Sequence, residues 1–279
     1  MKERIGQGRT ADIFRHPDNG SRVIKLFQPH VPEDDVRREF QIAALAHSLG
    51  VPTPEPFEII RANGRWGIVF ERAAGEPLLK QMLGKPLSFK RHARKLAALH
   101  HALHVRKMDG QLATDRRLPR QKDVLKRHIL SASALSEDEK QIAIARLEQL
   151  PDGDRLCHGD FHPDNVMTGE KDWMLDWVNG VRGHPAGDVA RTVMLLSVGA
   201  MPPGTPRYVN MLANVYRKKI RDQYVKDYLK RSGMKAADID RWLLPVAAAR
   251  LNEQVPEEER RQLLNFVRRQ SRPVLPVRQ

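Results

Sequence analysis

The stretch LCHGDFHPDNVM, residues 156–167, places polar side chains that could do chemistry between apolar flanks. Asp160 and Asn165 lie five positions apart. At that spacing a carboxylate could accept the proton of a reacting hydroxyl while an amide oxygen binds a metal ion. Asp, Asn, Gly and Pro also form ordinary turns, so this pattern alone is compatible with a structural loop. A phosphoryl-transfer role requires a phosphate-binding element and a second metal ligand elsewhere in the chain.

A candidate phosphate-binding element lies in the segment IGQGRTADIF near the N-terminus. Gly6, Gly8 and Ala11 are small residues, and such residues let backbone N–H groups approach phosphate oxygens. A dinucleotide-binding turn would open a helix and be followed about 20 residues later by an acidic residue. Here a strand pattern follows, and residue 25 is a lysine. The segment therefore fits a glycine-rich hairpin covering a nucleotide, with Lys25 on the next strand reaching the α- and β-phosphates.

Two carboxylates could complete this arrangement. Glu39 follows Lys25 by 14 residues, inside an amphipathic helical pattern, and could pair with the ammonium group. Asp176 ends an apolar stretch 11 residues after Asn165, a position from which it could bind Mg²⁺. Taken singly, Lys25 could point to solvent and Glu39 could belong to a solvated helix face. Their order along the chain, each on a suitable element, favours one common site.

The elements that must position these residues begin with a small lobe. Residues 4–14 and 22–28 are predicted strands, with the turn between them in HPDNGS. An amphipathic helix follows and ends at Gly50. A second hairpin, formed by FEIIRA and RWGIVFER, turns at Asn63 and Gly64. We therefore predict a lobe ordered ββαββ over residues 1–75.

Residues 76–279 are predicted to form a larger, mostly helical lobe. Ser136 and Glu139 form a capping box at the start of one helix, and four helical stretches follow residue 186. The loop at residues 156–167 and a short hairpin after it interrupt the helices. The predicted fold class is α+β, with a small antiparallel N-terminal sheet plus a helix and a helical C-terminal lobe that carries the catalytic loop and the acceptor site.

Composition limits the class of protein. With 279 residues and 41% hydrophobic residues, the chain can bury a large core. No apolar run approaches the roughly 18 residues of a membrane span, and the start has no apolar stretch like that of a signal peptide. We therefore expect a cytoplasmic protein without a membrane partner. Cys157 is the only cysteine, which excludes an internal disulfide and indicates a small core residue.

The net charge of +14 is unevenly distributed along the chain. Residues 1–77 contain 11 Lys and Arg and 11 Asp and Glu, so the whole excess lies in the remainder. A basic excess can indicate nucleic-acid binding, but most of these residues lie at helical spacings typical of solvated faces. Specific nucleic-acid binding is therefore not expected.

These residues together resemble the aminoglycoside phosphotransferase and choline kinase family, which shares the protein-kinase fold. The resemblance covers about residues 4–200 and is carried by the glycines, Lys25, Glu39, HGDFHPDN and LDW. Glycine at position 159, where protein kinases have arginine, is typical of this small-molecule branch. No A-P-E segment follows Asp176, which argues against a protein kinase, and Ala11 stands where protein kinases have a third glycine.

The resemblance implies a small-molecule kinase that uses Mg²⁺ and ATP or GTP. Its implied catalytic base is Asp160. Its implied metal ligands are Asn165 and Asp176. The implied nucleotide-binding residues are Gly6, Gly8, Lys25 with its partner Glu39, and the backbone of Phe70, Glu71 and Arg72, where the two lobes connect.

Three further residues of the motif region receive structural interpretations. His158 is expected to support hydrogen bonding within the loop, and His162 is interpreted as a turn residue. Asp188 is expected either to support the catalytic loop or to act as a helix N-cap, and not to bind metal. The competing hypothesis is a catalytically silent nucleotide-binding or nucleic-acid-binding protein on a kinase-like fold. The presence of every expected catalytic residue disfavours it.

The acceptor is the least defined part of the function. Residues 178–279 hold 19 Lys and Arg against 9 Asp and Glu, a charge opposite to that expected for an aminoglycoside pocket. The aromatic residues of this region lie mostly at helical spacing, which indicates core packing more than a cage for a quaternary ammonium group. We therefore expect a neutral or anionic small-molecule acceptor, with Arg182 or His184 as contacts.

Overall fold

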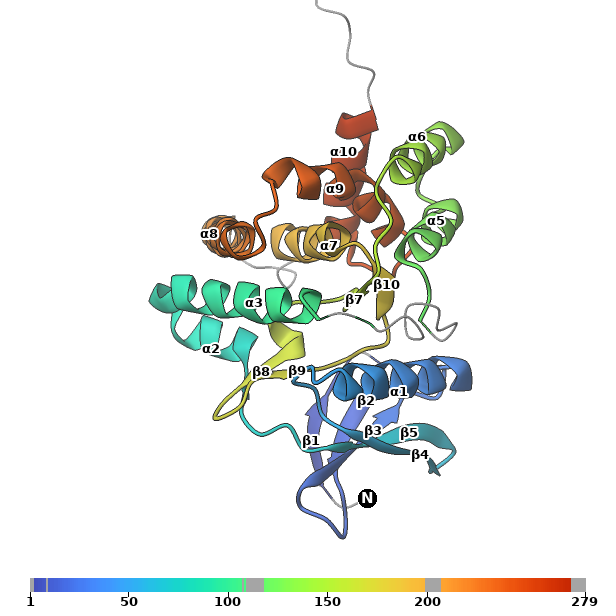
Figure 1. The fold of residues 1–279 in the computed structure, drawn as a ribbon, viewed down its shortest axis with the longest axis vertical. Helices are drawn as coiled ribbons and strands as arrows, with labels where there is room; N and C mark the ends of the chain where they lie inside the picture. The colour runs from blue at the N-terminus through green and yellow to red at the C-terminus, as the bar shows by residue number, and fades with distance from the viewer. Residues whose placement is uncertain (1–2, 9, 107, 109–117, 199–206, 272–279) are drawn as a thin grey trace, which may run out of the picture. The chain divides into compact units, whose positions relative to one another are not determined.

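The computed structural model describes residues 3–8, 10–106, 108, 118–198 and 207–271 (Figure 1). The chain divides into two compact units. The first contains Met1–Pro86, Arg106–Leu118 and His158–Val181, and the second contains Leu87–Val105, Pro119–Cys157 and Arg182–Gln279. The chain therefore returns to the first unit for the segment that carries Asp160. A lobe boundary between residues 75 and 76 stays a prediction.

The first unit is built on a five-stranded antiparallel sheet ordered β1-β2-β3-β5-β4. The buried side chains of Ile24, Leu26 and Val69 form its apolar cluster. Helix α1 packs on β4 and β5 along one side of the sheet (Figure 1). The bounds of these elements are β1 Arg4–Gln7, β2 Ala11–Arg15, β3 Arg22–Phe27, α1 Glu33–Ser48, β4 Pro56–Ala62 and β5 Arg65–Glu71.

This architecture confirms the predicted small sheet and helix, with one refinement. Residues 4–14 form two strands because the chain turns back after Gln7, and the amide of Gly8 donates to the carbonyl of Ala11 at 2.8 Å. The second predicted hairpin turns at Asn63 and Gly64, whose φ angles are 52° and 73°. Such left-handed conformations are common for Asn and Gly, so the dipeptide defines the turn.

The rest of the first unit surrounds the catalytic-loop segment. A three-stranded sheet has the order β6-β8-β9, and short helices flank it. Strand β8 pairs with both neighbours in antiparallel fashion. The elements are β6 Glu76–Pro77, α2 Leu78–Gly84, the 3-10 helix η2 Pro163–Asn165, β8 Val166–Thr168 and β9 Trp173–Met174. The 3-10 helix η1, Pro86–Ser88, begins at the last residue of the segment Met1–Pro86.

The second unit is mostly helical, as predicted. Helix α9 packs against α5, α6, α7 and α10, and α8 packs against α3 and α7. The capping box at Ser136 and Glu139 is present at the start of α6. Cys157 is buried, which confirms it as a core residue. The elements are α3 Phe89–His104, α5 Gln121–Ser131, α6 Glu137–Glu148, β7 Arg155–Cys157, β10 Val181–Gly183, α7 Pro185–Ser197, α8 Arg207–Ser232, α9 Ala236–Arg250 and α10 Glu257–Ser271.

None of the helices in the described part of the chain has the length and apolar character that a membrane span needs.

A buried polar cluster joins helices α3, α7 and α8 within the second unit. One carboxylate oxygen of Asp188 lies 3.0 Å from Nε2 of His100 and 3.1 Å from Nε2 of His104. The Nδ1 atoms of these histidines each lie 2.7 Å from a tyrosine hydroxyl, those of Tyr224 and Tyr228. Because an ionised carboxylate can only accept, both Nε2 atoms donate to it, and neutral imidazoles then accept from the tyrosines.

The predicted N-cap role of Asp188 is wrong. His184 is the N-cap of α7, and its Nδ1 accepts from the amide of Ala186. Asp188 lies one turn inside the helix and is fully buried. Burial acts to raise the pKa of its carboxyl, but His100 and His104 outweigh this and hold the pKa well below its usual value. The carboxylate therefore fastens α7 to α3.

We expect Asp188→Ala to lower the free energy of unfolding by about 2–5 kcal/mol, because it leaves two buried imidazole donors without their acceptor. Urea denaturation followed by circular dichroism measures the change. Asp222→Ala is the control, since Asp222 is half-exposed and pairs with Arg221 on the surface. It should cost at most about 1 kcal/mol. Equal losses in the two variants would contradict the structural role of Asp188.

Candidate active site

The loop that carries Asp160 follows strand β7 and has a backbone conformation that requires glycine. Gly159 has a φ of 76°. A Cβ atom at this position would collide with the backbone carbonyl of Asn179. An arginine could not occupy this site without moving the segment after Asp176. The glycine that distinguishes the HGD motif is therefore a packing requirement of this loop.

Two contacts join the loop to the segment that ends at Asp176. Nε2 of His158 lies 2.9 Å from the carbonyl oxygen of Leu175, to which it donates. The amide of Leu175 donates to the carbonyl of Asn165 at 2.9 Å. The imidazole of His158 also packs against the Trp177 ring, with 4.6 Å between centroids. The two candidate metal ligands, Asn165 and Asp176, thus flank one short hairpin and are held in register.

Lys25, Glu39 and Asp176 converge as the sequence predicts. Nζ of Lys25 lies 2.6 Å from Oε1 of Glu39 and 2.9 Å from Oδ1 of Asp176. These residues come from β3, α1 and the segment after β9, so one ammonium group joins three parts of the first unit. The side chain of Glu39 is 2% exposed and that of Lys25 is 12% exposed, whereas that of Asp176 is 35% exposed. Asp176 is therefore the most accessible of the three side chains, and Glu39 is closed to solvent.

Burial and charge act against one another in this cluster. Burial raises the pKa of Glu39 to about 7, although Lys25 acts in the opposite direction. Its second oxygen, Oε2, has no hydrogen-bond partner among the described residues. Burial also acts to raise the pKa of Asp176, but the charge of Lys25 outweighs it and the pKa lies below the usual value. The pKa of Lys25 is raised by both carboxylates despite its burial, so this group stays charged.

Asp160, the candidate base, lies in the same electrostatic environment. Its charge acts to raise the pKa of Asp176. Its backbone carbonyl accepts from Nδ2 of Asn165 at 2.9 Å. Nε2 of His162 lies 3.5 Å from Oδ2 of Asp160, while Nδ1 of the same ring accepts from the amide of Asp164. His162 is thus a turn residue as predicted, but it also faces the candidate base.

Asn165 and Asp176 have the chemistry that Mg²⁺ requires. The amide nitrogen of Asn165 is used in the bond to Asp160, which leaves the amide oxygen available to a ligand. Asp176 contributes an ionised, partly exposed carboxylate. Carboxylate and amide oxygens are hard ligands suited to Mg²⁺, which commonly uses one or two protein groups together with substrate phosphates. The residues present therefore fit this ion.

The glycine-rich turn between β1 and β2 has an anchor that the sequence analysis missed. Nη2 of Arg65 donates to Oδ2 of Asp12 at 2.8 Å and to the carbonyl of Leu26 at 2.9 Å. Asp12 pairs with Gln7 at the base of the turn that contains Gly8. Arg65 is 53 residues distant from Asp12 in the chain, so no local pattern marks it.

The predicted adenine-binding stretch lies at the end of β5. The amide of Glu71 donates to the carbonyl of Glu55, and the amide of Arg72 donates to the carbonyl of Ser21, both at 2.8 Å. Phe70 pairs with Val23 inside the sheet. Since the amides of Glu71 and Arg72 are occupied, adenine binding at this stretch stays a prediction that would use carbonyl oxygens.

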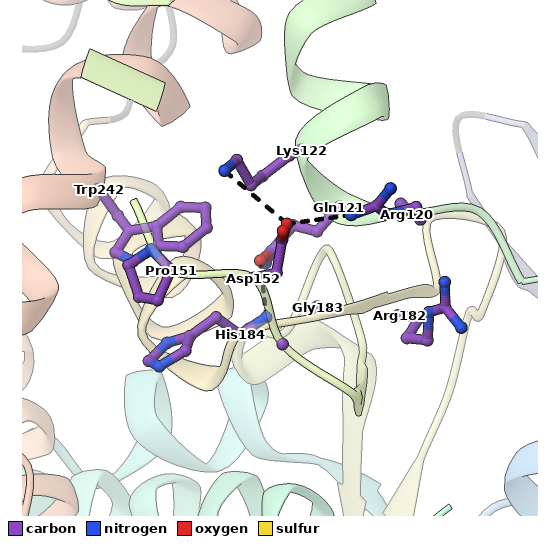
Figure 2. A pocket seen from close by; sticks show the side chains of 10 residues that line it. Arg120, Gln121, Lys122, Pro151, Asp152, Arg182, Gly183, His184 and Trp242 are labelled. Atoms are coloured by element: carbon purple, nitrogen blue, oxygen red, sulfur yellow. Dashed lines mark hydrogen bonds and ion pairs between the residues drawn. The ribbon is translucent and has the colours of Figure 1, made fainter. Parts of the chain in front are cut away.

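Arg182 and His184, the expected acceptor contacts, belong to the second unit. Both line one pocket there, together with Trp242 and the start of α5 (Figure 2). The structure thus brings these two residues together.

The fold is similar to that of several solved small-molecule kinases. One is an aminoglycoside-3'-phosphotransferase of type VIII, with 18% identity, a TM-score of 0.57, and coverage of 90% of this chain and 91% of the other. Another is a choline/ethanolamine kinase family protein from Mesorhizobium loti, with 17% identity, a TM-score of 0.52, and coverage of 96% and 86%. A third is an aminoglycoside phosphotransferase from Streptomyces rimosus solved with ADP and streptomycin, with 15% identity, a TM-score of 0.52, and coverage of 85% and 90%. A search of curated proteins by sequence finds no significant match.

The fold is therefore that of the kinase-like phosphotransferases, which confirms the predicted fold class. The chain belongs to the Phosphotransferase enzyme family, whose model matches residues 3–241. It is a small-molecule kinase, as the resemblance implied.

The raised pKa of Glu39 predicts an acid limb in the activity. As the pH falls through about 7, Glu39 takes up a proton and no longer holds Lys25 by charge, so kcat/KM for the nucleotide should fall. The contribution of this carboxyl to the free energy of unfolding has the opposite pH dependence to the activity. It is fully present below pH 4.5, the ordinary pKa, and is lost as the pH rises through about 7.

We expect Glu39→Gln to remove this acid limb from the pH profile and to lower kcat/KM at pH 8. Steady-state kinetics between pH 5.5 and about 9 measure both effects. Glu33→Gln, at the exposed side of the first turn of the same helix, should leave the profile unchanged. If kcat/KM of Glu39→Gln still falls at acid pH as in the wild type, the fall is due to the titration of another group.

Proposed function

We propose that the protein transfers the γ-phosphoryl group of ATP or GTP to a hydroxyl group of a neutral or anionic small molecule, with Mg²⁺ as the cofactor. The observation that carries this proposal is the convergence of Lys25, Glu39 and Asp176 beside the loop of Asp160 and Asn165. Each of these groups has a defined task in phosphoryl transfer.

Lys25 supplies a fixed positive charge for the nucleotide phosphates. Glu39 is buried and positions the ammonium group, which also forms an ion pair with Asp176. When nucleotide binds, phosphate oxygens can replace Asp176 as the partner of Lys25. Mg²⁺ held by Asn165 and Asp176 would neutralise charge on the transferred phosphoryl group. The site is therefore arranged to stabilise negative charge with groups already in place.

Asp160 is the group that orients the acceptor. Its carboxylate is held through the backbone of the HGD loop, and it can accept a hydrogen bond from the reacting hydroxyl. In a loose transition state the proton leaves late, so most of the rate comes from in-line positioning and charge neutralisation. Asp160 then receives that proton as the new O–P bond forms.

The charge of residues 178–279 supports a neutral or anionic acceptor. This part of the chain has 19 basic and 9 acidic residues. A polycationic aminoglycoside would require clustered carboxylates, because like charges across an interface are unfavourable. The structural relatives named for aminoglycosides support the phosphotransfer chemistry and leave the acceptor of this chain to be identified.

We expect Mg-ATP or Mg-GTP to raise the melting temperature of the protein. Saturation at 100 times Kd corresponds to about 2.7 kcal/mol of added stability. Lys25→Ala should weaken nucleotide affinity by about tenfold or more, because it removes the charge that meets the phosphates. Lys85→Ala changes an exposed lysine of the same unit and should keep the wild-type shift. A melting curve unmoved by millimolar Mg-nucleotide in the wild type would contradict the proposed function.

The role of Asp160 is tested by a nucleotide-consumption assay against amino alcohols, sugars, anionic metabolites and aminoglycosides. Asp160→Asn should reduce kcat for the acceptor that is turned over by about 10²-fold or more and leave nucleotide binding nearly unchanged. Asp164→Asn alters an exposed carboxylate four residues away and should keep wild-type turnover. Wild-type kcat in Asp160→Asn would remove this residue from the mechanism.

A further inference from the structure

A polar cluster lies at one end of the five-stranded sheet in the first unit. Its centre is the carboxylate of Asp12, whose side chain is 9% exposed. Oδ2 of Asp12 accepts from Nη2 of Arg65 at 2.8 Å and from Nε2 of Gln28 at 3.4 Å, and Oδ1 lies 3.7 Å from Nη1 of Arg4. Arg4 lies in β1, Gln28 follows β3 directly, and Arg65 is the first residue of β5. One buried carboxylate in β2 therefore joins four neighbouring segments of the sheet (Figure 1).

The guanidinium group of Arg65 connects β2 to β3 through three contacts. Besides its bond to Asp12, Nη2 donates to the carbonyl of Leu26 at 2.9 Å, and Nε donates to the carbonyl of Phe27 at 2.6 Å. Leu26 follows Lys25 directly in β3 and pairs with Asp12. A guanidinium group presents its N–H donors in a fixed planar arrangement, so three such contacts define one position. They fix the base of the glycine-rich turn relative to the strand that carries Lys25.

The glycine-rich turn lies where the sheet is least supported. In the described sheet β1 is an edge strand and pairs with β2 alone. Two backbone hydrogen bonds lie at the turn, from the amide of Gly8 to the carbonyl of Ala11 and from the amide of Gln28 to the carbonyl of Thr10, both at 2.8 Å. Because a hairpin is at best marginally stable by itself, the position of this turn depends on how its base is joined to the other strands. Asp12 provides that connection.

Stability is a weak explanation for this ion pair. The side chains of Asp12 and Arg65 are 9% and 19% exposed, so both charges are largely removed from water. The cost of that removal roughly offsets their attraction, and apolar residues of similar volume are often equally stable. Charge-assisted hydrogen bonds add geometric specificity instead, because they form in one arrangement of the strands. Such precision matters for phosphate binding, where donors must lie within about 0.5 Å of the productive geometry.

We propose that Arg65 is a positioning residue for phosphate binding, and that it acts through Asp12. This inference rests on the proposed nucleotide-dependent function. The ion pair holds the glycine-rich turn at a fixed distance from Lys25, so the backbone N–H groups of the turn and the Lys25 ammonium meet the same phosphates. Arg65 contacts Asp12 and two carbonyl groups of β3, and its role requires no contact with the nucleotide.

The test is isothermal titration calorimetry of the full chain with Mg-ATP and Mg-GTP, which measures Kd and stoichiometry separately. We expect Kd for the bound nucleotide to be about tenfold weaker in Arg65→Gln at unchanged stoichiometry, because the turn no longer lies where the phosphates meet Lys25. Arg61→Gln removes an exposed arginine of β4, which lies over the Trp66 ring, and should keep the wild-type Kd. A lower stoichiometry at wild-type Kd would mean that Arg65 only maintains the folded state, and would overturn the proposal.

A second variant applies if Arg65→Gln does not fold. Asp12→Asn keeps the shape of the side chain and an acceptor oxygen but removes the charge, so Kd should be about threefold weaker. A wild-type Kd in either folded variant would overturn the positioning role, while nucleotide binding by the wild type would leave the proposed function intact. Absence of Mg-nucleotide binding to the wild type would instead overturn the proposed function, and this inference with it.

Discussion

The ammonium group of Lys25, shared between Glu39 and Asp176, is the interaction on which the candidate active site depends. It joins a strand, a helix and the segment after β9 within the first unit. Taking charges out of water costs several kcal/mol each, and an apolar set of similar volume is often as stable or more so. Burial raises the pKa of Glu39 to about 7, in the direction that this cost requires. Stability alone therefore does not explain the cluster, whereas the proposed role of Lys25 in phosphate binding would.

The loop that carries Asp160 shows how backbone constraints position the proposed catalytic and metal-binding groups. Gly159 adopts a left-handed conformation and packs against a carbonyl where a Cβ atom does not fit. His158 ties the loop to Leu175, and the hairpin places Asn165 and Asp176 at its two ends. Contacts of this kind fix donors and ligands before substrate arrives, which removes reorganisation from the reaction step.

The charged residues are unevenly distributed along the chain. Residues 1–77 are neutral overall, and their few charged groups at the site are paired. The basic excess lies beyond them, and part of it gathers in the pocket of Arg120, Lys122 and Arg182.

The sequence by itself determined the chemistry and the order of the elements. Asp160, Asn165 and Asp176 lie close together in the chain, and Gly6, Gly8 and Lys25 lie on adjacent predicted strands. Local spacing and turn residues therefore mark these residues, and the resemblance of the whole set to a known family indicates the kinase-like fold. The capping box at Ser136 and the turn at Asn63 are equally local, because they depend on hydrogen bonds within a few residues.

Only the tertiary structure decided which distant residues meet. It placed Asp188 between two histidines of another helix instead of at a helix cap, set Arg65 under the glycine-rich turn, and paired Arg120 with Arg182. Such contacts join residues far apart in the chain, and many registers of packing satisfy the same local pattern. The packing arrangement that forms is the one that buries the most apolar surface while pairing the buried polar groups across whole helices and sheets. Because this depends on many distant residues at once, it cannot be inferred from any short stretch of sequence.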